Sequence, residues 1–251
     1  MRIDIITLFP EMCEAVMGES IIGRAQKSNA IEVNCHQLRD YAFDKHRRVD
    51  DAPYGGGMGM LMMAEPIALC FEDICKKIGS RPHFIYMSPQ GKTLTQERIK
   101  ELAQYENVCL LCGHYEGVDE RLIEKYIDEE ISIGDYVLTG GELPALVLAD
   151  SLARMAPGVL SNNECFELES HYNGLIEYPQ YTRPSVWRGI EVPEVLTSGH
   201  HKNVEEFRRR ESIIRTAKKR PDLLENAELT DKERELAENV LLGEYKKQKN
   251  F

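Results

Sequence analysis

The sequence contains no long hydrophobic segment. Its longest apolar run extends from Leu143 to Ala149 and includes Pro144, whereas a helix that spans a membrane needs about 18 or more apolar residues. The first ten residues are interrupted by Asp4 and Pro10 and have no small-residue cleavage site, so they do not resemble a secretory signal. We therefore expect a cytoplasmic protein with no membrane partner.

Several motifs of nucleotide and metal sites are also missing. No Gly-x-Gly-x-x-Gly motif follows a predicted strand, so a dinucleotide site is not indicated. Gly91-Lys92-Thr93 resembles the end of a P-loop, but that motif would need glycine at the position of Tyr86. The histidines show neither HExxH nor another paired spacing, so the sequence predicts no metal site.

The cysteine pattern does not indicate a disulfide framework. The chain has seven cysteines, an odd number, and a reducing compartment would keep them as thiols. Cys109 and Cys112 have the CxxC spacing of redox and zinc sites, but no second CxxC or histidine pair accompanies them. Because both lie in an apolar run, we interpret them as buried strand residues.

Charge is distributed unevenly along an acidic chain, whose formal net charge is −11. Residues 1–173 carry 16 Lys and Arg against 28 Asp and Glu, whereas residues 174–251 carry 15 against 14. The segment 208–220 has seven basic residues and one acidic residue. Such a local excess is compatible with a bound polyanion, although the same run could form an ordinary solvated helix face.

Two kinds of segment alternate up to about residue 156. Apolar β-branched runs predict strands at 3–9, 31–35, 83–87, 108–112 and 131–133, and helical spacing predicts helices at 11–25, 67–78, 96–103, 120–126 and 142–155. This alternation is typical of an α/β fold whose largely parallel sheet is covered on both faces. Beyond residue 173 strand signals cease, and amphipathic helices are predicted at 205–219 and 231–247.

These patterns predict three regions. An α/β domain extends over residues 1–160, a mobile linker over 161–173, and a small all-helical domain over 174–251. Pro157-Gly158 should stop the preceding helix. The residues that follow show neither the helical nor the alternating spacing of apolar residues, so we assign them to a linker.

Four clusters that contain glycine stand out. Glycine outside helices usually marks tight turns or close approach of the backbone to a ligand. The last three clusters follow predicted strands, and ligands in open α/β folds bind at the carboxyl ends of strands. We therefore expect these three loops to line one pocket. The clusters are Tyr54–Met60, Ser88–Gly91, Cys112–Arg121 and Ser132–Pro144.

Together the clusters resemble the bacterial tRNA (guanine-N1-)-methyltransferase family, which modifies guanosine 37 beside the anticodon. The resemblance covers essentially the whole chain, including Ile5–Pro10, Pro157–Leu160, Tyr181–Pro184 and Arg220–Leu224. It implies a SPOUT-type α/β domain with a deep trefoil knot, a rare exception to the rule that chains do not thread loops. It also implies an obligate homodimer with active sites at the interface.

The resemblance further implies that S-adenosylmethionine is the methyl donor and binds, bent, in the knot. The resemblance also implies magnesium as a further cofactor, but the sequence shows no group of residues with the spacing of metal ligands. Glycines in the site would let the backbone reach the adenine, and apolar side chains would enclose its ring. The cofactor residues implied are Tyr86, Met87, Ser88, Gly113, Ile133, Gly134, Asp135, Tyr136, Val137, Leu138, Gly140, Gly141 and Pro144.

Methylation of guanine N1 requires removal of its proton, so negative charge develops mainly at O6. Such a site needs a general base near N1 and a cation or donor near O6. The family uses a linker aspartate as the base, and an arginine that maps to Arg154. Here the aspartate position holds Glu169, with Glu167 in reserve. The alternative function is therefore a non-catalytic or slow tRNA-binding relative, because a base misplaced by ~1 Å can cost ~100-fold in rate.

The resemblance also implies contacts with tRNA. Glu116 would select guanine by binding its amino and imino edge, although an acidic residue near a helix N-terminus can have a purely structural role. Asp50 follows a basic segment at 45–48. The full set of expected tRNA-binding residues is Asp50, Gly59, Glu116, Ser170, Arg183, Arg208, Arg209 and Arg215.

Overall fold

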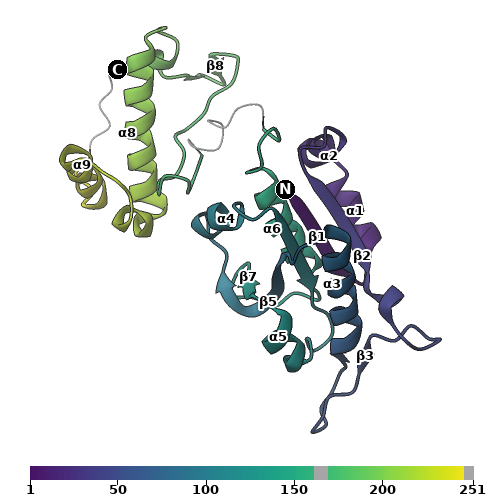
Figure 1. The fold of residues 1–251 in the computed structure, drawn as a ribbon. Helices are drawn as coiled ribbons and strands as arrows, with labels where there is room; N and C mark the ends of the chain where they lie inside the picture. Colours follow the sequence, from purple (N-terminus) through teal and green to yellow (C-terminus); the bar gives the residue numbers. More distant parts are fainter. Residues whose placement is uncertain (161–168, 246–251) are drawn as a thin grey trace. The chain divides into compact units, whose positions relative to one another are not determined.

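The computed structural model describes residues 1–160 and 169–245 (Figure 1). The chain forms two compact units, Met1–Asn162 and Asn163–Phe251. No helix in the described ranges combines the length and the apolar character that a membrane span requires. Most of the expected linker, including Glu167, lies outside the described residues.

The first unit is built on a five-stranded sheet in which every pair of neighbouring strands is parallel. The strand order is β2-β1-β6-β5-β7. This arrangement confirms the predicted parallel α/β fold. The strands are β1 (Arg2–Thr7), β2 (Glu32–Gln37), β5 (His83–Thr93), β6 (Asn107–Cys112) and β7 (Glu129–Ser132).

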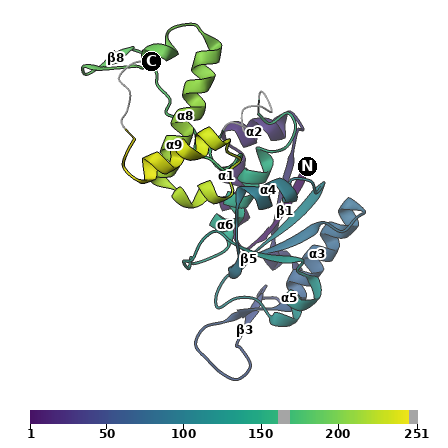
Figure 2. The ribbon, with the colours of Figure 1, turned by 90° about the vertical axis from the view of Figure 1, so that its left-hand side faces the viewer.

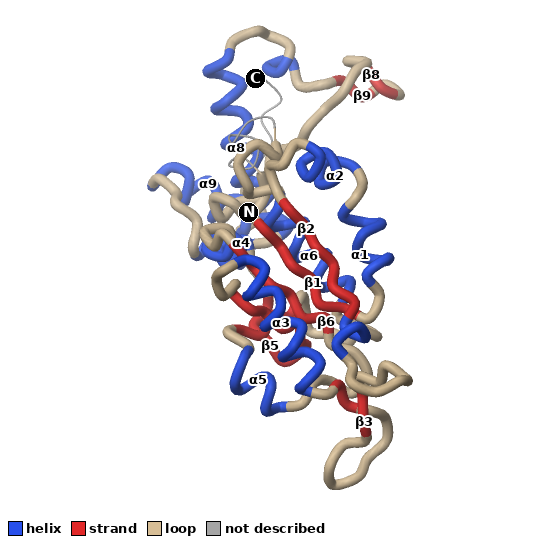
Figure 3. The backbone as a smooth tube through the Cα atoms, turned by 45° about the vertical axis from the view of Figure 1, so that its right-hand side comes forward, coloured by secondary structure: helices blue, strands red, loops and turns tan. Residues whose placement is uncertain are grey.

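Helices cover both faces of this sheet, as Figure 2 and Figure 3 show. Successive strand side chains point to opposite faces, so Ile85 and Met87 belong to one core and Phe84 and Tyr86 to the other. One face packs against α1 (Pro10–Met17), α2 (Ser20–Lys27), α4 (Gln96–Leu102) and α6 (Glu142–Ala153). The other packs against α3 (Ala64–Ile78) and α5 (Glu120–Tyr126).

The single helix predicted over 11–25 is wrong, because α1 and α2 are separate. Gly18 caps α1, and Ser20 begins α2 with a positive φ of 53°. Cys13 of α1 and Ile22 of α2 are nevertheless buried in the same core. The apolar spacing therefore continues across the break and does not reveal it.

Strand β5 extends beyond its predicted end at residue 87. The segment Ser88–Gly91, predicted as a loop, lies within this strand, and the pairing of β5 with β7 shifts register between Met87 and Lys92. A Cβ atom on Gly91 would lie 2.5 Å from the carbonyl oxygen of Glu130. Glycine at this position thus allows the two backbones to approach closely.

The threading of a trefoil knot in this unit, which the family resemblance implies, stays a prediction.

A projecting loop at residues 52–60 lies between two short strands that the sequence did not predict. After the 3₁₀ helix η1 (Leu38–Tyr41), β3 (Asp50–Asp51) pairs antiparallel with β4 (Leu61–Met62). The amide of Met62 donates to the carbonyl of Gly117 at 2.9 Å. This bond attaches the base of the loop to the segment that follows β6.

The second unit contains the two helices that its sequence predicted, α8 (His201–Lys219) and α9 (Asp231–Leu241). They are connected through η3 (Pro221–Glu225) and enclose a small core that includes Ile213, Leu224 and Ala237. A capping box between Thr230 and Glu233 begins α9.

The prediction that this region contains no strands is wrong. A hairpin is formed by β8 (Val186–Trp187) and β9 (Ile190–Glu191), and the 3₁₀ helix η2 (Glu194–Leu196) follows it. The hairpin turn consists of Arg188 and Gly189, which both have positive φ angles, 51° and 79°. Two consecutive positive φ values match the twist of paired strands. Each strand has only two residues, so neither produces an alternating pattern in the sequence.

One carboxylate is completely buried in the sheet of the first unit. Asp4 on β1 is 0% exposed and accepts hydrogen bonds from Arg2 at 2.8 and 3.0 Å. Nε2 of His36 on β2 lies 2.7 Å from the same carboxylate. Burial alone would raise the pKa of Asp4, but the hydrogen bonds from His36 and Arg2 hold it below its ordinary value. The ionised carboxylate therefore joins β1 to β2.

Replacing Asp4 should destabilise this unit substantially. Removing one partner of a buried ion pair costs about 3–5 kcal/mol, so we expect Asp4→Ala to lower the free energy of unfolding by that amount at pH 7. The pKa is lower in the folded state, so this contribution is complete above the unfolded-state pKa of about 4. It should be lost as the pH falls below that value, which urea unfolding at several pH values would measure. The control is Glu32→Ala, which removes the exposed partner of Arg2 and an exposed hydrogen bond from Asn34. Equal effects of the two substitutions would contradict the interpretation.

Candidate active site

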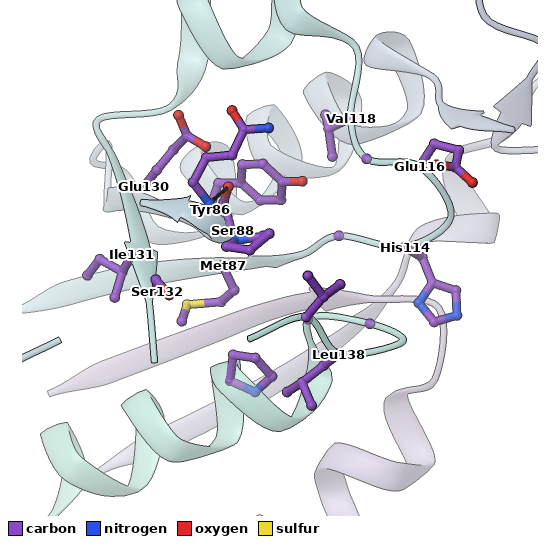
Figure 4. A pocket seen from close by; sticks show the side chains of 18 of the residues that line it. Tyr86, Met87, Ser88, His114, Glu116, Val118, Glu130, Ile131, Ser132 and Leu138 are labelled. Atoms are coloured by element: carbon purple, nitrogen blue, oxygen red, sulfur yellow. Dashed lines mark hydrogen bonds between the residues drawn. The ribbon is translucent and has the colours of Figure 1, made fainter. Parts of the chain in front are cut away.

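A cavity of about 530 Å³ lies at the carboxyl ends of β5, β6 and β7 (Figure 4). Four segments provide most of its wall: 86–90, 113–118, 130–134 and 136–141. Its volume is typical of sites for small molecules. The three glycine clusters that follow the central strands in the sequence thus meet around one cavity.

Twelve of the thirteen predicted cofactor residues line this cavity, and Asp135 does not. The lining also includes residues that the prediction missed. Gln90, Tyr115 and Thr139 belong to the glycine clusters and could have been found there, whereas Glu130 is a strand residue with no such signal. The twelve are Tyr86, Met87, Ser88, Gly113, Ile133, Gly134, Tyr136, Val137, Leu138, Gly140, Gly141 and Pro144.

The cavity depends on a backbone contact between Gly113 and Gly141. The Gly141 amide donates to the Gly113 carbonyl at 2.8 Å, immediately before α6 begins. A Cβ atom on Gly141 would lie 2.7 Å from the Gly113 nitrogen and 2.8 Å from Cα of Cys112. The protein's own backbone, rather than a ligand, therefore requires glycine at position 141.

Gly113 also makes room for a buried tyrosine. A Cβ atom on Gly113 would lie 2.7 Å from Cε2 of Tyr86. Burial, followed by the charges of Glu130 and Glu120, raises the pKa of Tyr86 to about 12. The phenol is therefore neutral at physiological pH and forms an uncharged part of the wall.

The charged groups of the cavity are mainly acidic. Glu116, Glu120 and Glu130 line it, and among the described residues that form its wall there is no lysine or arginine. Carboxylates around a partly desolvated cavity favour a positively charged ligand. The electrostatics thus differ from those expected of a phosphate-binding pocket.

A second polar contact holds the start of α6. Glu142 is buried and accepts a hydrogen bond from the hydroxyl of Thr7 at 2.9 Å, which connects α6 to the end of β1. Nδ1 of His114, another lining residue, lies 3.9 Å from the same carboxylate. These contacts place the N-terminus of α6 beneath the 113–118 segment.

Two of the predicted substrate residues meet at the edge of the cavity. Gly59 has a φ of 89°, and a Cβ atom there would lie 2.5 Å from Cγ of Glu116. The Glu116 amide donates to the carbonyl of Met60 at 3.0 Å. Asp50 lies in β3, at the base of the projecting loop, and does not line the cavity.

Neither of the two predicted catalytic residues belongs to the wall of this cavity. Arg154 is the C-cap of α6, whereas the cavity is at the N-terminal end of that helix, and 12 helical residues extend about 18 Å. Glu169 is half-buried in the second unit, and its backbone carbonyl accepts a hydrogen bond from the amide of Tyr172 at 3.4 Å. The catalytic roles of both residues stay predictions.

The arginines of α8 have different surroundings. The guanidinium of Arg208 lies 4.9 Å from the centre of the Tyr178 ring. Arg209 forms an ion pair with Glu233 of α9 at 2.7 Å and donates to the Glu228 carbonyl at 2.8 Å. The hydrogen bond from Arg209 lowers the pKa of Glu233 to about 2. Arg209 therefore stabilises the α8–α9 pair, and contact with tRNA would compete with this role.

The remaining predicted tRNA residues are spread over the second unit. Arg183 is exposed and Arg215 is half-buried on α8. The hydroxyl of Ser170 accepts a hydrogen bond from the Glu177 amide at 3.0 Å. The structure does not gather these residues into one cluster, and their contacts with tRNA stay predictions.

The interpretation of the CxxC pair as buried strand residues is confirmed. Cys109 and Cys112 are both 0% exposed in β6, and burial raises the pKa of each thiol well above its ordinary value. Over the described ranges, no group of three or more His, Cys, Asp or Glu residues is arranged to hold a metal ion.

A family model described as tRNA (Guanine-1)-methyltransferase TrmD matches residues 1–226. The chain belongs to this family. A relative from Ruminiclostridium cellulolyticum is 60% identical over 223 residues, which are 89% of this chain and 96% of the relative. One from Desulforamulus reducens is 50% identical over 247 residues, 97% of each chain. Both are named tRNA (guanine-N(1)-)-methyltransferase.

A solved structure has the same fold. The crystal structure of tRNA (m1G37) methyltransferase from Aquifex aeolicus matches with a TM-score of 0.73 and 38% sequence identity, covering 90% of this chain and 95% of that one. This match supports the SPOUT-type fold expected from the sequence. These relatives carry the names of enzymes, so they give no support to the alternative of a non-catalytic member of the TrmD family.

The close contact between Gly113 and Gly141 leads us to predict that a larger residue at position 141 disturbs the cavity. Gly141→Ala should force these backbones apart, because neither Gly113 nor Cys112 can yield as a flexible side chain would. We expect a loss of about 1–3 kcal/mol in the free energy of unfolding, the usual cost of overpacking, and a much weaker affinity for S-adenosylmethionine in calorimetry. Glu97→Ala, at an exposed position of α4 outside the cavity wall, is the control. Wild-type affinity in Gly141→Ala would show that the contact does not shape the cavity.

Proposed function

We propose that this chain transfers the methyl group of S-adenosylmethionine to N1 of guanosine 37 in tRNA. The observation that supports this most strongly is the cavity, in which the glycine clusters shared with the TrmD family converge at the carboxyl ends of three parallel strands. The alternative of a non-catalytic relative would not require so complete a cavity.

The residues of the cavity fit S-adenosylmethionine. That molecule carries a positive sulfonium and an ammonium group, which suit the carboxylates of Glu116, Glu120 and Glu130. Leu138 and Met87 offer apolar surface for a flat ring, and Gly140 and Gly113 leave backbone groups accessible. When bound, S-adenosylmethionine supplies an electrophilic methyl group. The proposal assigns no role to magnesium.

The two residues predicted for catalysis, Glu169 and Arg154, would supply the base and the cation that methylation of guanine N1 requires. The carboxylate of Glu169 would take the proton from N1, and the guanidinium of Arg154 would stabilise the charge that develops on O6. Glu116, at the edge of the cavity beside Gly59, would accept a hydrogen bond from the 2-amino group of guanine. Selection of guanine and its deprotonation would thus use different carboxylates.

We propose that two copies of the chain complete each site. The cavity and Arg154 lie at opposite ends of α6. On the same helix Leu143 and Val147, one turn apart, are 52% and 46% exposed, and together they offer an apolar surface that a second copy could cover. A twofold axis across this face would pack the two α6 helices antiparallel. Each cavity would then lie beside the partner's Arg154.

Methyl transfer to a defined nucleotide tests the proposed function. With tritium-labelled S-adenosylmethionine, an unmodified tRNA with guanosine at position 37 should become labelled, and digestion should yield 1-methylguanosine. The same tRNA with adenosine 37 should remain unlabelled, because adenine lacks the 2-amino group that Glu116 would bind and the O6 atom that Arg154 would stabilise. Equal labelling of both tRNAs, or of neither, would contradict the proposal.

The role of Glu169 can be tested separately. Glu169→Gln keeps the size of the side chain but cannot accept the proton, so single-turnover rates should fall by about 100- to 10,000-fold. Glu169→Asp should retain substantial activity, since it keeps the carboxylate. Glu167→Gln is the matched control and should behave like the wild type. If Glu169→Gln is unimpaired while Glu167→Gln is inactive, the base is Glu167.

A further inference from the structure

The β8–β9 hairpin exposes three large apolar side chains. Trp187 and Ile190 are 59% and 65% exposed, and Val186 on the same hairpin is also exposed. Trp187 is the only tryptophan in the chain. Clustered apolar groups on a surface are characteristic of sites that bind another molecule.

The backbone of the hairpin presents Trp187 in a defined way. The two-residue turn of Arg188 and Gly189 fixes the direction of the strands. The amide of Val192 donates to the carbonyl of Ser185 at 2.9 Å and extends the pairing beyond the strands. The tryptophan is therefore carried on a paired element rather than on an irregular loop.

An arginine covers one face of this ring. The guanidinium carbon of Arg188 lies 5.1 Å from the centre of the Trp187 ring, a cation–π contact. Residues 181–191 contain two arginines, Arg183 before β8 and Arg188 in the turn, and one acidic residue, Glu191 at the end of β9, although the whole chain has a net charge of −11. The hairpin and the residues before it thus combine an aromatic surface with a small local excess of positive charge in an acidic protein.

Aromatic rings and arginine guanidinium groups together are how proteins bind unpaired bases. Bases stack on the ring, and the cation attracts the phosphates. A partner protein with an apolar surface would use the exposed Val186 and Ile190, whereas a nucleic acid would use Trp187 for its bases and the arginines for its phosphates. The charge therefore favours a nucleic acid as the occupant.

We propose that Trp187, supported by Arg188, is a stacking platform for an unpaired base of the tRNA substrate. This inference rests on the proposed function and adds to it a contact in the second unit, outside the cavity. The platform would contribute to affinity for tRNA and not to the chemical step.

The single tryptophan allows this contact to be observed directly. Stacking of a base on Trp187 should quench its fluorescence, so titration of the wild-type protein with unmodified tRNA should lower the emission until the sites are saturated. S-adenosylmethionine alone should leave the emission unchanged. Unchanged emission at saturating tRNA, in a preparation that methylates the same tRNA, would overturn this inference and leave the proposed function intact.

Substitution supplies the second measurement. Trp187→Ala should weaken tRNA binding by about 5- to 100-fold, the effect of losing one base–aromatic stack, and raise KM for tRNA with kcat unchanged. Trp187→Phe should restore most of the affinity. The dependence of binding on salt should stay the same in Trp187→Ala, because stacking releases no counterions, whereas it should weaken in Arg188→Gln. Equal tRNA affinity in Trp187→Ala and the wild type would overturn the proposal.

A second copy of the chain is the other occupant that these experiments can detect. In that case the emission of the free protein would be blue-shifted and protected from iodide, and it would shift to the red on dilution. This result would assign the hairpin to a protein interface and overturn the stacking platform.

Discussion

The candidate site depends on the place where β6 and α6 meet backbone to backbone. Gly113 and Gly141 share a hydrogen bond of 2.8 Å at a separation that leaves no space for a Cβ atom on Gly141. This contact joins the loop after β6 to the start of α6, and the bond between Thr7 and Glu142 secures the same helix end to β1. A cavity at the carboxyl ends of the strands follows from this arrangement.

The direction of α6 has a further consequence. The helix starts at the cavity and ends at Arg154, so one chain cannot place that arginine beside its own cavity without a large change of structure. In the proposed homodimer, a second copy packed antiparallel on the exposed face of α6 would supply it. The proposal of a homodimer therefore follows from the proposed role of Arg154 and from its position at the far end of the helix.

The proposed reaction needs one site for a cationic methyl donor and another for an anionic tRNA, and the two units differ in charge accordingly. A cationic methyl donor suits the carboxylates that line the cavity, whereas an anionic tRNA would be repelled by a uniformly acidic protein. Basic residues of the second unit would offset this repulsion locally, since the segment 208–220 has seven basic residues and one acidic residue and the hairpin carries Arg188. Arg209 contributes less to this positive charge, because it forms an ion pair with Glu233.

Much of the first unit was predictable because its elements are long and periodic. The strands and helices that carry the cavity have alternating or helical apolar spacing, and the glycine clusters mark where strands end. The errors occur where local signals conflict with tertiary contacts. Ser88–Gly91 has the composition of a loop but is held in β5 by pairing with β7, and the β8–β9 hairpin is too short to leave a pattern.

The catalytic residues could be named only through the family resemblance. Nothing in the spacing around Arg154 or Glu169 distinguishes either residue from other charged residues of the chain. The proposed roles need groups that lie far apart in the sequence or in two copies of the chain, which a single sequence does not encode as a local pattern. The cavity, by contrast, is built from neighbouring loops of one sheet.

Mixed dimers provide the most direct test of the central claim, that each site combines the cavity of one copy with the Arg154 of the other. Differently tagged subunits allow two kinds of mixed dimer to be purified. A dimer of one Gly141→Ala subunit and one Arg154→Ala subunit retains an intact cavity that faces an intact arginine, so it should keep about half of the wild-type methylation rate. A dimer of one doubly substituted subunit and one wild-type subunit should be inactive. The reverse pattern, with the second dimer active and the first inactive, would contradict the account.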